Sequence, residues 1–224
     1  MHIAFLHTAD AHVATFDALL AAQAAAIRVT HRVRPDLLDR ARADGLDTVR
    51  DETLRELTAL SGADAVVCTC STLGPIADAA ATDAPHVLRI DRPLMQAGCA
   101  NGPNIAVAIC LASTRNATLA LLHDCATQPI TPQIIMCADA WPWFEAGNMA
   151  GFAASIADTI NAALIKDTTC VILAQASMAV AAPLLQHTGL PVLSSPALAT
   201  ERAISVARQR RLKPAPMSPT TIAG

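Results

Sequence analysis

The sequence has little net charge and no long hydrophobic run. Its 16 basic and 19 acidic residues leave a formal charge of −3 over 224 residues, which gives no electrostatic reason to bind nucleic acid or an anionic membrane surface. The best apolar stretch, NIAVAICLAS at 104–113, falls well short of the roughly 18 residues that a bilayer-spanning helix needs. We therefore expect no nucleic-acid partner and no membrane partner.

Motifs for nucleotides and metals are also missing. Neither GxGxxG nor GxxxxGK occurs among the nine glycines, so the sequence contains no glycine-rich phosphate loop. Cys68 and Cys70 form a Cys-x-Cys pair, but no second Cys or His pair stands near them at ligand spacing. We expect no cofactor and no metal site.

The seven cysteines are an odd number and follow no secretion signal, because MHIAFLHTAD has no basic segment and its apolar stretch breaks after Leu6. This indicates a cytoplasmic protein whose thiols stay reduced and mostly fill apolar space. Cys68 is expected in the core, and five more are interpreted as structural: Cys99, Cys110, Cys125, Cys137 and Cys170.

Hydrophobic residues make up 53% of the chain and gather in short runs that end in small polar residues. An alanine-rich helical pattern follows most of these runs. Near-continuous apolar runs that alternate with helices indicate parallel strands covered on both faces. The predicted strands lie within 2–10, 26–33, 64–72, 86–93, 104–114, 133–139, 169–177 and 191–196.

Two pairs of runs match at one spacing. VVCTC ends at Cys70 and VILAQ ends at Gln175, while HVLRIDRP and PVLSSP align Val87 with Val192; both offsets are 105 residues. The repeat predicts an α/β fold of two similar three-layer halves, with parallel sheets related by a pseudo-twofold. Ligands of such sheets bind at the carboxyl ends of the strands, so we expect an active cleft between the halves.

Small polar residues end the longer strands, and we expect them to line this cleft. The candidates are His7, Thr8, Asp10, Cys70, Ser71, Thr72, Ser113, Thr114, Gln175, Ala176 and Ser177. His7 could orient a base or bind substrate, or else serve as a cap or core residue, and His12 is less favoured. The cluster ADAWPWFEAGN at 138–148 is expected to pack against the core, with a lid or an interface as the alternative.

Cys70 is the candidate whose side chain and position favour a reactive group most. It lies where a helix is expected to begin, with Ser71 or Thr72 as the cap and Pro75 in the first turn. Free N–H groups and the helix dipole at such a place lower the pKa of a thiol and can hold a carboxylate. The alternative is a buried cysteine beside an ordinary cap.

Several segments resemble the aspartate/glutamate racemase superfamily, which includes hydantoin racemases, maleate cis–trans isomerases and arylmalonate decarboxylase. VVCTCST is similar to the first-half motif of the family and VILAQASMA to the second-half motif. HTADAHVATFDALL, LRIDRPLMQAG, WFEAGN and VLSSPALA also resemble a racemase-like branch. The resemblance covers roughly residues 2–208. It implies a first half of residues 1–98 plus 197–212 and a second half of 99–196. The Pro-, Ser- and Thr-rich composition of residues 213–224 predicts a flexible tail.

The family resemblance implies a reaction without cofactor at a carbon next to a carboxylate, with two cysteines on opposite faces of that carbon. Cys70 matches the first cysteine, Thr114 resembles the hydroxyl that binds the substrate carboxylate, and Ser177 would add a donor. The second cysteine falls on Gln175, and an amide neither takes nor gives a proton near neutral pH.

Three functions stay open at this point. The chain could be an isomerase or racemase in which Cys70 acts as thiolate acid and base and His7 or a water replaces the second thiol. It could be a one-cysteine lyase, decarboxylase or covalent isomerase, or a non-catalytic protein that binds a small carboxylate. Family members are often dimers or larger, so a homo-oligomer is a possible assembly.

Overall fold

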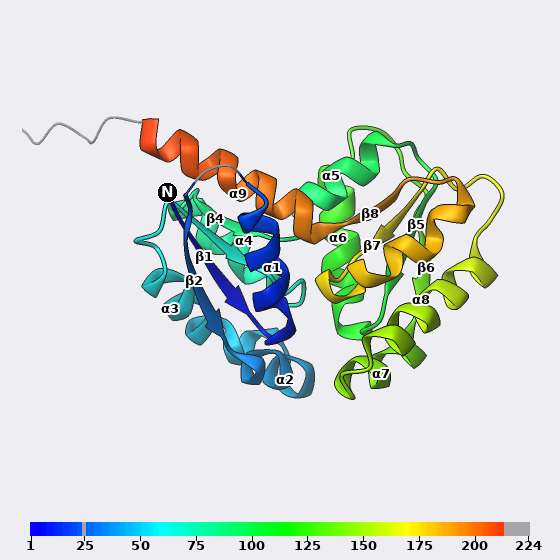
Figure 1. The fold of residues 1–224 in the computed structure, drawn as a ribbon, viewed down its shortest axis with the longest axis horizontal. Coiled ribbons are helices and arrows are strands. Elements are labelled where there is room, and N and C mark those ends of the chain that lie inside the picture. Colours follow the sequence, from blue (N-terminus) through cyan, green and yellow to red (C-terminus); the bar gives the residue numbers. More distant parts are fainter. Residues whose placement is uncertain (24–25, 213–224) are drawn as a thin grey trace, which may run out of the picture.

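The computed structural model describes residues 1–23 and 26–212, and the predicted tail at 213–224 lies outside this range. Eight strands form two four-stranded parallel sheets, in the orders β2-β1-β3-β4 and β6-β5-β7-β8 (Figure 1). The strands are β1 His2–His7, β2 Arg28–Val33, β3 Ala65–Cys68, β4 Val87–Arg89, β5 Ile105–Ile109, β6 Gln133–Met136, β7 Cys170–Leu173 and β8 Val192–Ser194. The predicted α/β fold of two parallel-sheet halves is confirmed.

The strand register reproduces the sequence repeat. Val66 of β3 pairs with Val87 of β4, and Val171 of β7 pairs with Val192 of β8, so both strands recur after 105 residues. Ile3 pairs with Ala65 in the first half, and Ile105 pairs with Cys170 in the second. The first strand of each half therefore recurs after 102 residues, and Cys70 and Gln175 occupy equivalent places two residues beyond β3 and β7.

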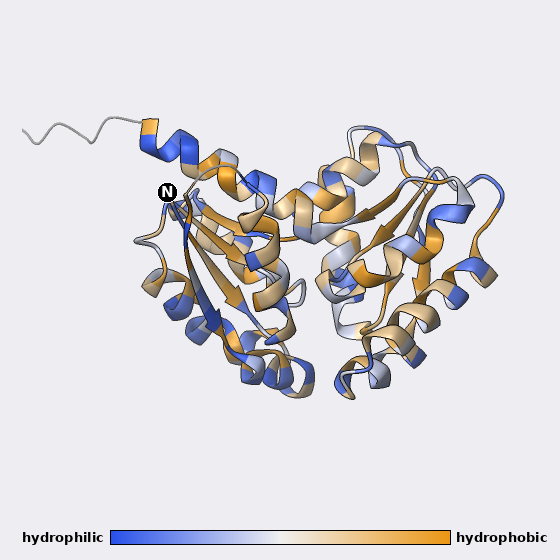
Figure 2. Ribbon diagram, viewed as in Figure 1, coloured by the Kyte–Doolittle hydropathy of each residue, from blue (hydrophilic) through white to orange (hydrophobic). Residues whose placement is uncertain are grey.

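Helices cover both faces of each sheet. Figure 2 shows hydrophobic residues along the central strands, whereas the edge strand β2 is partly hydrophilic. The helices are α1 Ala11–Ala21, α2 Pro35–Asp44, α3 Arg50–Ala59, α4 Gly74–Asp83, α5 Arg92–Ala100, α6 Arg115–Cys125, α7 Trp141–Glu145, α8 Met149–Ala163 and α9 Ser195–Leu212, with 3-10 helices η1 Leu46–Val49, η2 Ala112–Thr114, η3 Ala138–Ala140 and η4 Ala176–Thr188. Within the described residues, no helix combines the length and apolar composition that crossing a bilayer requires.

Two helices connect the halves. Leu94 and Met95 of α5 are buried with Ile105 and Ile172 of the second sheet, so the predicted boundary at residue 98 lies inside a helix that packs on the second half. Helix α9 follows β8 and returns across the molecule (Figure 1). Its Ala203 is buried against first-half strands in the cluster that also contains Ile3 and Phe5.

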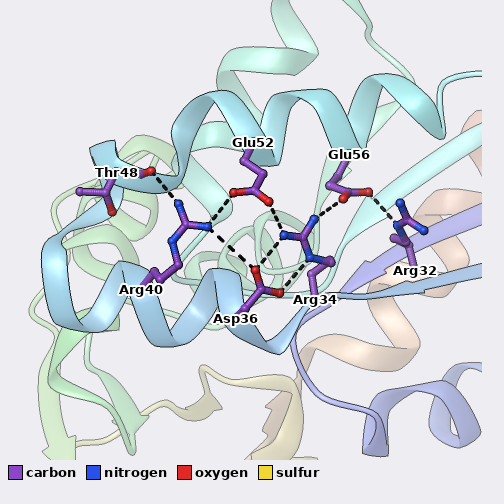
Figure 3. A network of polar contacts seen from close by, with 7 residues as sticks. All are labelled: Arg32, Arg34, Asp36, Arg40, Thr48, Glu52 and Glu56. Atoms are coloured by element: carbon purple, nitrogen blue, oxygen red, sulfur yellow. Dashed lines mark hydrogen bonds and ion pairs between the residues drawn. The ribbon is translucent and has the colours of Figure 1, made fainter.

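An ion-pair network fixes α2 against α3 (Figure 3). Arg34 pairs with Glu52 and Glu56 of α3 and with Asp36, at 2.7 Å, in the first turn of α2. Arg40 of α2 donates to Glu52 at 2.6 Å. A charge network with forked arginine contacts holds geometry better than an isolated surface pair, so α2 is held against α3.

Candidate active site

A cavity of about 170 Å³ lies between the two halves at the carboxyl ends of their strands. Most of the residues predicted for the cleft line it. These are Thr8, Cys70, Ser71, Thr72, Thr114, Gln175, Ala176 and Ser177. The parallel strands bring them together because all of them follow β1, β3, β5 or β7.

Cys70 lies in the short connection between β3 and α4 and is 7% exposed. The helix begins at Gly74, four residues after the thiol, and Leu73 precedes it without a side-chain cap. The predicted cap by Ser71 or Thr72 is therefore wrong, although Pro75 does lie in the first turn. Ser71 Oγ instead donates to the Ala174 carbonyl of the second half at 3.1 Å, and this bond ties the two strand ends together.

Two effects act on the Cys70 thiol. Burial raises its pKa, and this outweighs the hydroxyl of Thr8, the N–H groups of Leu73 and Thr72 and the hydroxyl of Thr72, which act in the opposite direction. The prediction of a lowered pKa is wrong because the enclosed site penalises the charged sulfur more than the donors stabilise it. At neutral pH Cys70 carries its proton.

Gln175 has a fixed orientation at the equivalent place in the second half. Its Oε1 accepts from the N–H groups of Cys110, at 2.6 Å, and Leu111, at 3.1 Å, beyond the end of β5. A flipped amide would set its NH2 against these donors, so Nε2 points the other way. Nε2 makes no hydrogen bond to another described residue, and Gln175 therefore offers the cavity a donor rather than an acid or base.

The second-half hydroxyls differ in availability. Thr114 Oγ1 donates its proton to the Leu111 carbonyl at 2.7 Å. The Thr114 hydroxyl can therefore only accept a further hydrogen bond. Ser177 is the second residue of η4 and lines the cavity, and its hydroxyl makes no hydrogen bond to another described residue. Of the two, Ser177 is the hydroxyl that can donate to a bound anion.

Three predicted residues do not line the cavity: His7, Asp10 and Ser113. Asp10 and Ser113 are exposed to solvent. His7 is fully buried, and its Nδ1 contacts Thr69 Oγ1 at 2.8 Å while its Nε2 contacts His31 Nδ1 at 2.8 Å. Burial lowers the pKa of His7 to about 3, so a neutral ring stands behind the cavity wall.

Other cavity residues escaped the sequence analysis. Leu38, Asp39 and Arg42 come from one face of α2, and Trp141, Phe144 and Glu145 come from one face of α7. Their spacings of three and four residues were the available signal. His12 of α1, which the sequence favours less than His7, also lines the cavity, as does Leu111.

The rim joins the two halves. Arg42 Nη1 lies 3.8 Å from Glu145 Oε1, and its guanidinium carbon lies 5.8 Å from the Trp141 ring centroid. Trp141 Nε1 donates to the same Glu145 oxygen at 2.6 Å. Figure 1 shows α2 and α7 at the same end of their halves, facing each other. Trp141 and Phe144 of the aromatic cluster pack against the second-half core, as expected, and they also line the cavity. The lid alternative stays a prediction.

No group of three or more His, Cys, Asp or Glu side chains suited to a metal ion occurs within residues 1–23 and 26–212.

No family model matches the chain, and no curated protein matches it in sequence. Solved structures do match. The chain has the fold of the aspartate and glutamate racemases. Aspartate racemase of Picrophilus torridus has a TM-score of 0.66 at 13% identity, over 94% of this chain and 98% of that one. Glutamate racemase of Francisella tularensis subsp. tularensis SCHU S4, in complex with D-glutamate, has a TM-score of 0.73 at 14% identity, over 96% and 83%.

Arylmalonate decarboxylase shares the fold as well, with a TM-score of 0.56 at 14% identity over 92% of each chain. The resemblance that the sequence motifs indicated is confirmed at the level of the fold. Racemases and a decarboxylase share it, so the fold alone does not choose between these reactions.

Proposed function

We propose that this chain is a cofactor-independent isomerase or racemase that moves a proton at a carbon next to a carboxylate, with Cys70 as an acid–base group. The observation that carries the proposal is the thiol of Cys70 in a small cavity between two racemase-like halves, with hydroxyl and N–H donors around its sulfur. A thiol so enclosed can deliver a proton to carbon, and the surrounding donors stabilise the thiolate that remains.

Substrate binding is assigned to donors of the second half. Gln175 and Ser177 line the cavity, and neither Gln175 Nε2 nor Ser177 Oγ makes a hydrogen bond to another described residue. Two neutral donors suit a carboxylate, which accepts several hydrogen bonds. The substrate is a small carboxylic acid, because a cavity of about 170 Å³ has little room for more.

A one-cysteine decarboxylase or lyase is the second candidate. Gln175 stands where a second thiol would, and Cys70 rests as a thiol because burial raises its pKa. Such a site suits protonation of the carbanion left when a carboxylate departs as carbon dioxide. The reaction needs one proton donor and no base on the opposite face.

Hydrogen exchange separates these functions. The protein would be incubated in D2O with a panel of amino acids, hydroxy acids, hydantoins and arylmalonates, with NMR and chiral chromatography as readouts. We expect at least one acid to exchange its α-hydrogen, and Cys70→Ser to lose about 100-fold or more of that rate. Cys68→Ala, which removes a buried thiol two residues away, is the matched control and should stay near the unmodified rate.

Release of carbon dioxide without exchange would favour the decarboxylase. Binding of an acid without turnover would favour the non-catalytic carboxylate-binding protein. Exchange that survives Cys70→Ser would contradict both catalytic proposals.

A further inference from the structure

The cavity contains an imidazole that shares its walls with Cys70. His12 is the second residue of α1 and lines the cavity. We propose that His12 is the second proton-transfer residue of the reaction, taking the part that an amide at position 175 cannot take. This inference rests on the proposed function.

Hydrogen bonding distinguishes His12 from the other histidine near the site. Both ring nitrogens of His7 are occupied, by Thr69 Oγ1 and His31 Nδ1. The His12 ring lies 6.1 Å from the His7 ring, centroid to centroid, and makes no hydrogen bond to another described residue. His7 therefore backs the site, whereas the nitrogens of His12 are free to meet a ligand.

The resting protonation states of the two groups are complementary. Burial lowers the pKa of His12 to about 4, so its ring is a neutral base at pH 7, while burial keeps the proton on Cys70. A neutral base and a protonated acid in one cavity suit a reaction in which one group removes a proton from carbon and the other delivers one. Besides His12, the titratable and charged groups that line the cavity are Cys70 after β3, Asp39 and Arg42 of α2, and Glu145 of α7. The His7 ring of β1 lies 6.1 Å from the His12 ring.

The proton balance closes without another reactant. A lone pair of His12 takes the hydrogen from the carbon beside the carboxylate, so a C–H bond breaks, an N–H bond forms and the electron pair stays on the substrate as an enolate. The S–H bond of Cys70 then breaks as a new C–H bond forms, which leaves a thiolate and an imidazolium. Return of one proton from His12 to Cys70, through water, restores the starting protein.

The test uses the acid found by the exchange assay and the full chain. His12→Gln keeps a hydrogen-bonding side chain but removes the base, so kcat should fall about 100-fold or more while KM changes little. The variant His12→Gly should regain part of its rate when imidazole is added to the solution. His187→Gln, at an exposed histidine of η4, is the matched control and should keep the unmodified rate.

The pH profile is an independent readout. For the unmodified protein, kcat/KM should fall as pH drops through about 4, where His12 becomes charged, and the variant's residual rate should lack this limb. An unchanged unfolding midpoint and unchanged Cys70 alkylation would show that the variant site is intact.

Retention of kcat within about threefold by His12→Gln, while Cys70→Ser is inactive, would overturn this inference and leave the proposed function standing. If His12→Gly loses activity and imidazole does not restore it, His12 is a structural residue. If His12→Gln changes KM but not kcat, His12 is a binding residue. Either result would also overturn this inference. No exchange of any acid by the unmodified protein would contradict both proposals.

Discussion

Burial and hydrogen bonding act in opposite directions on Cys70. The enclosed position disfavours the thiolate, and the hydroxyls of Thr8 and Thr72 with the N–H groups of Thr72 and Leu73 favour it. Burial has the larger effect on the pKa, so the sulfur is protonated at rest, and the four donors stabilise the thiolate that forms when it gives up its proton. A low pKa marks a cysteine that reacts as a thiolate. A cysteine that acts as an acid toward carbon must instead carry its proton before the reaction.

Removing one of these donors should raise the pKa of Cys70 further. In Thr8→Val the side chain keeps its shape and loses the hydroxyl that stabilises the thiolate, so alkylation of Cys70 by iodoacetamide at pH 8.5 should slow several-fold. Thr15→Val, which removes an exposed hydroxyl on α1, should leave the rate unchanged. Peptide mass mapping measures both rates, and faster labelling in Thr8→Val would show that the hydroxyl does not assist the sulfur.

At the scale of elements, the strands were predictable and the cavity rim was not. Central parallel strands are buried on both faces, which forces apolar runs such as Ala65–Cys68 and Cys170–Leu173. The repeat of 105 residues predicts that Gln175 occupies the position in the second half that Cys70 occupies in the first. The hydrogen bonds that Gln175 Oε1 accepts from the N–H groups after β5 could not be predicted, because a contact between residues distant in the sequence leaves no local pattern.

The rim residues escaped for a different reason. Arg42 and Trp141 lie about a hundred positions apart and meet only because α2 and α7 end on the same side of the two halves. The sequence does not favour His12, because one polar residue near the start of an alanine-rich helix does not reveal what it faces. Tertiary contact, rather than propensity, decides these positions.

Helix α5 packs on β7 through Gly98. A β-carbon added there would overlap Ile172 Cδ1, so Gly98→Ala forces the helix or the side chain to move. We expect a loss of about 1–3 kcal/mol in the free energy of unfolding. At Gly62 an added β-carbon meets nothing within 4 Å, so Gly62→Ala should change stability by less than about 0.5 kcal/mol. Urea denaturation measures both, and equal effects would contradict the packing described here.

The buried His7 couples β1 and β2 to pH. Its pKa is about 3 in the folded chain and near 6.5 when exposed, so the unfolded chain binds a proton in this window that the folded chain does not. Stability should therefore fall as pH drops below 6.5, by up to about 1.4 kcal/mol per pH unit from this group. Urea denaturation at pH 7, 6 and 5 should show a shallower slope in His7→Asn, whereas an identical slope would mean that His7 is charged in the fold.

At the scale of the molecule, the cavity exists only where the halves meet. Its floor comes from strand ends of both sheets, joined by the Ser71–Ala174 bond, and its rim comes from α2 and α7. The Arg42–Glu145 pair is exposed and 3.8 Å apart, so it should contribute less than about 1 kcal/mol to stability. Arg42 and Glu145 both line the cavity, so we expect a bound ligand to change the contact between them.

Tryptophan fluorescence should report that filling. Trp141 lines the cavity, whereas its neighbour Trp143 does not and is 46% exposed. Titration with malonate, or with an acid that exchanges, should change the emission of the unmodified protein and of Trp143→Phe. The change should disappear in Trp141→Phe, and a signal that follows Trp143 would place the ligand outside this cavity.

The central claim is that Cys70 faces the reacting carbon while Gln175 holds the carboxylate. A crystal structure of the protein with an exchanging acid, or with a close unreactive analogue of it, tests this most directly. We predict that the α-carbon lies about 3–3.5 Å from Cys70 Sγ and that Gln175 Nε2 donates to a carboxylate oxygen. A ligand bound with its α-carbon away from Cys70, or with the carboxylate on other donors while Gln175 Nε2 stays free, would contradict this account.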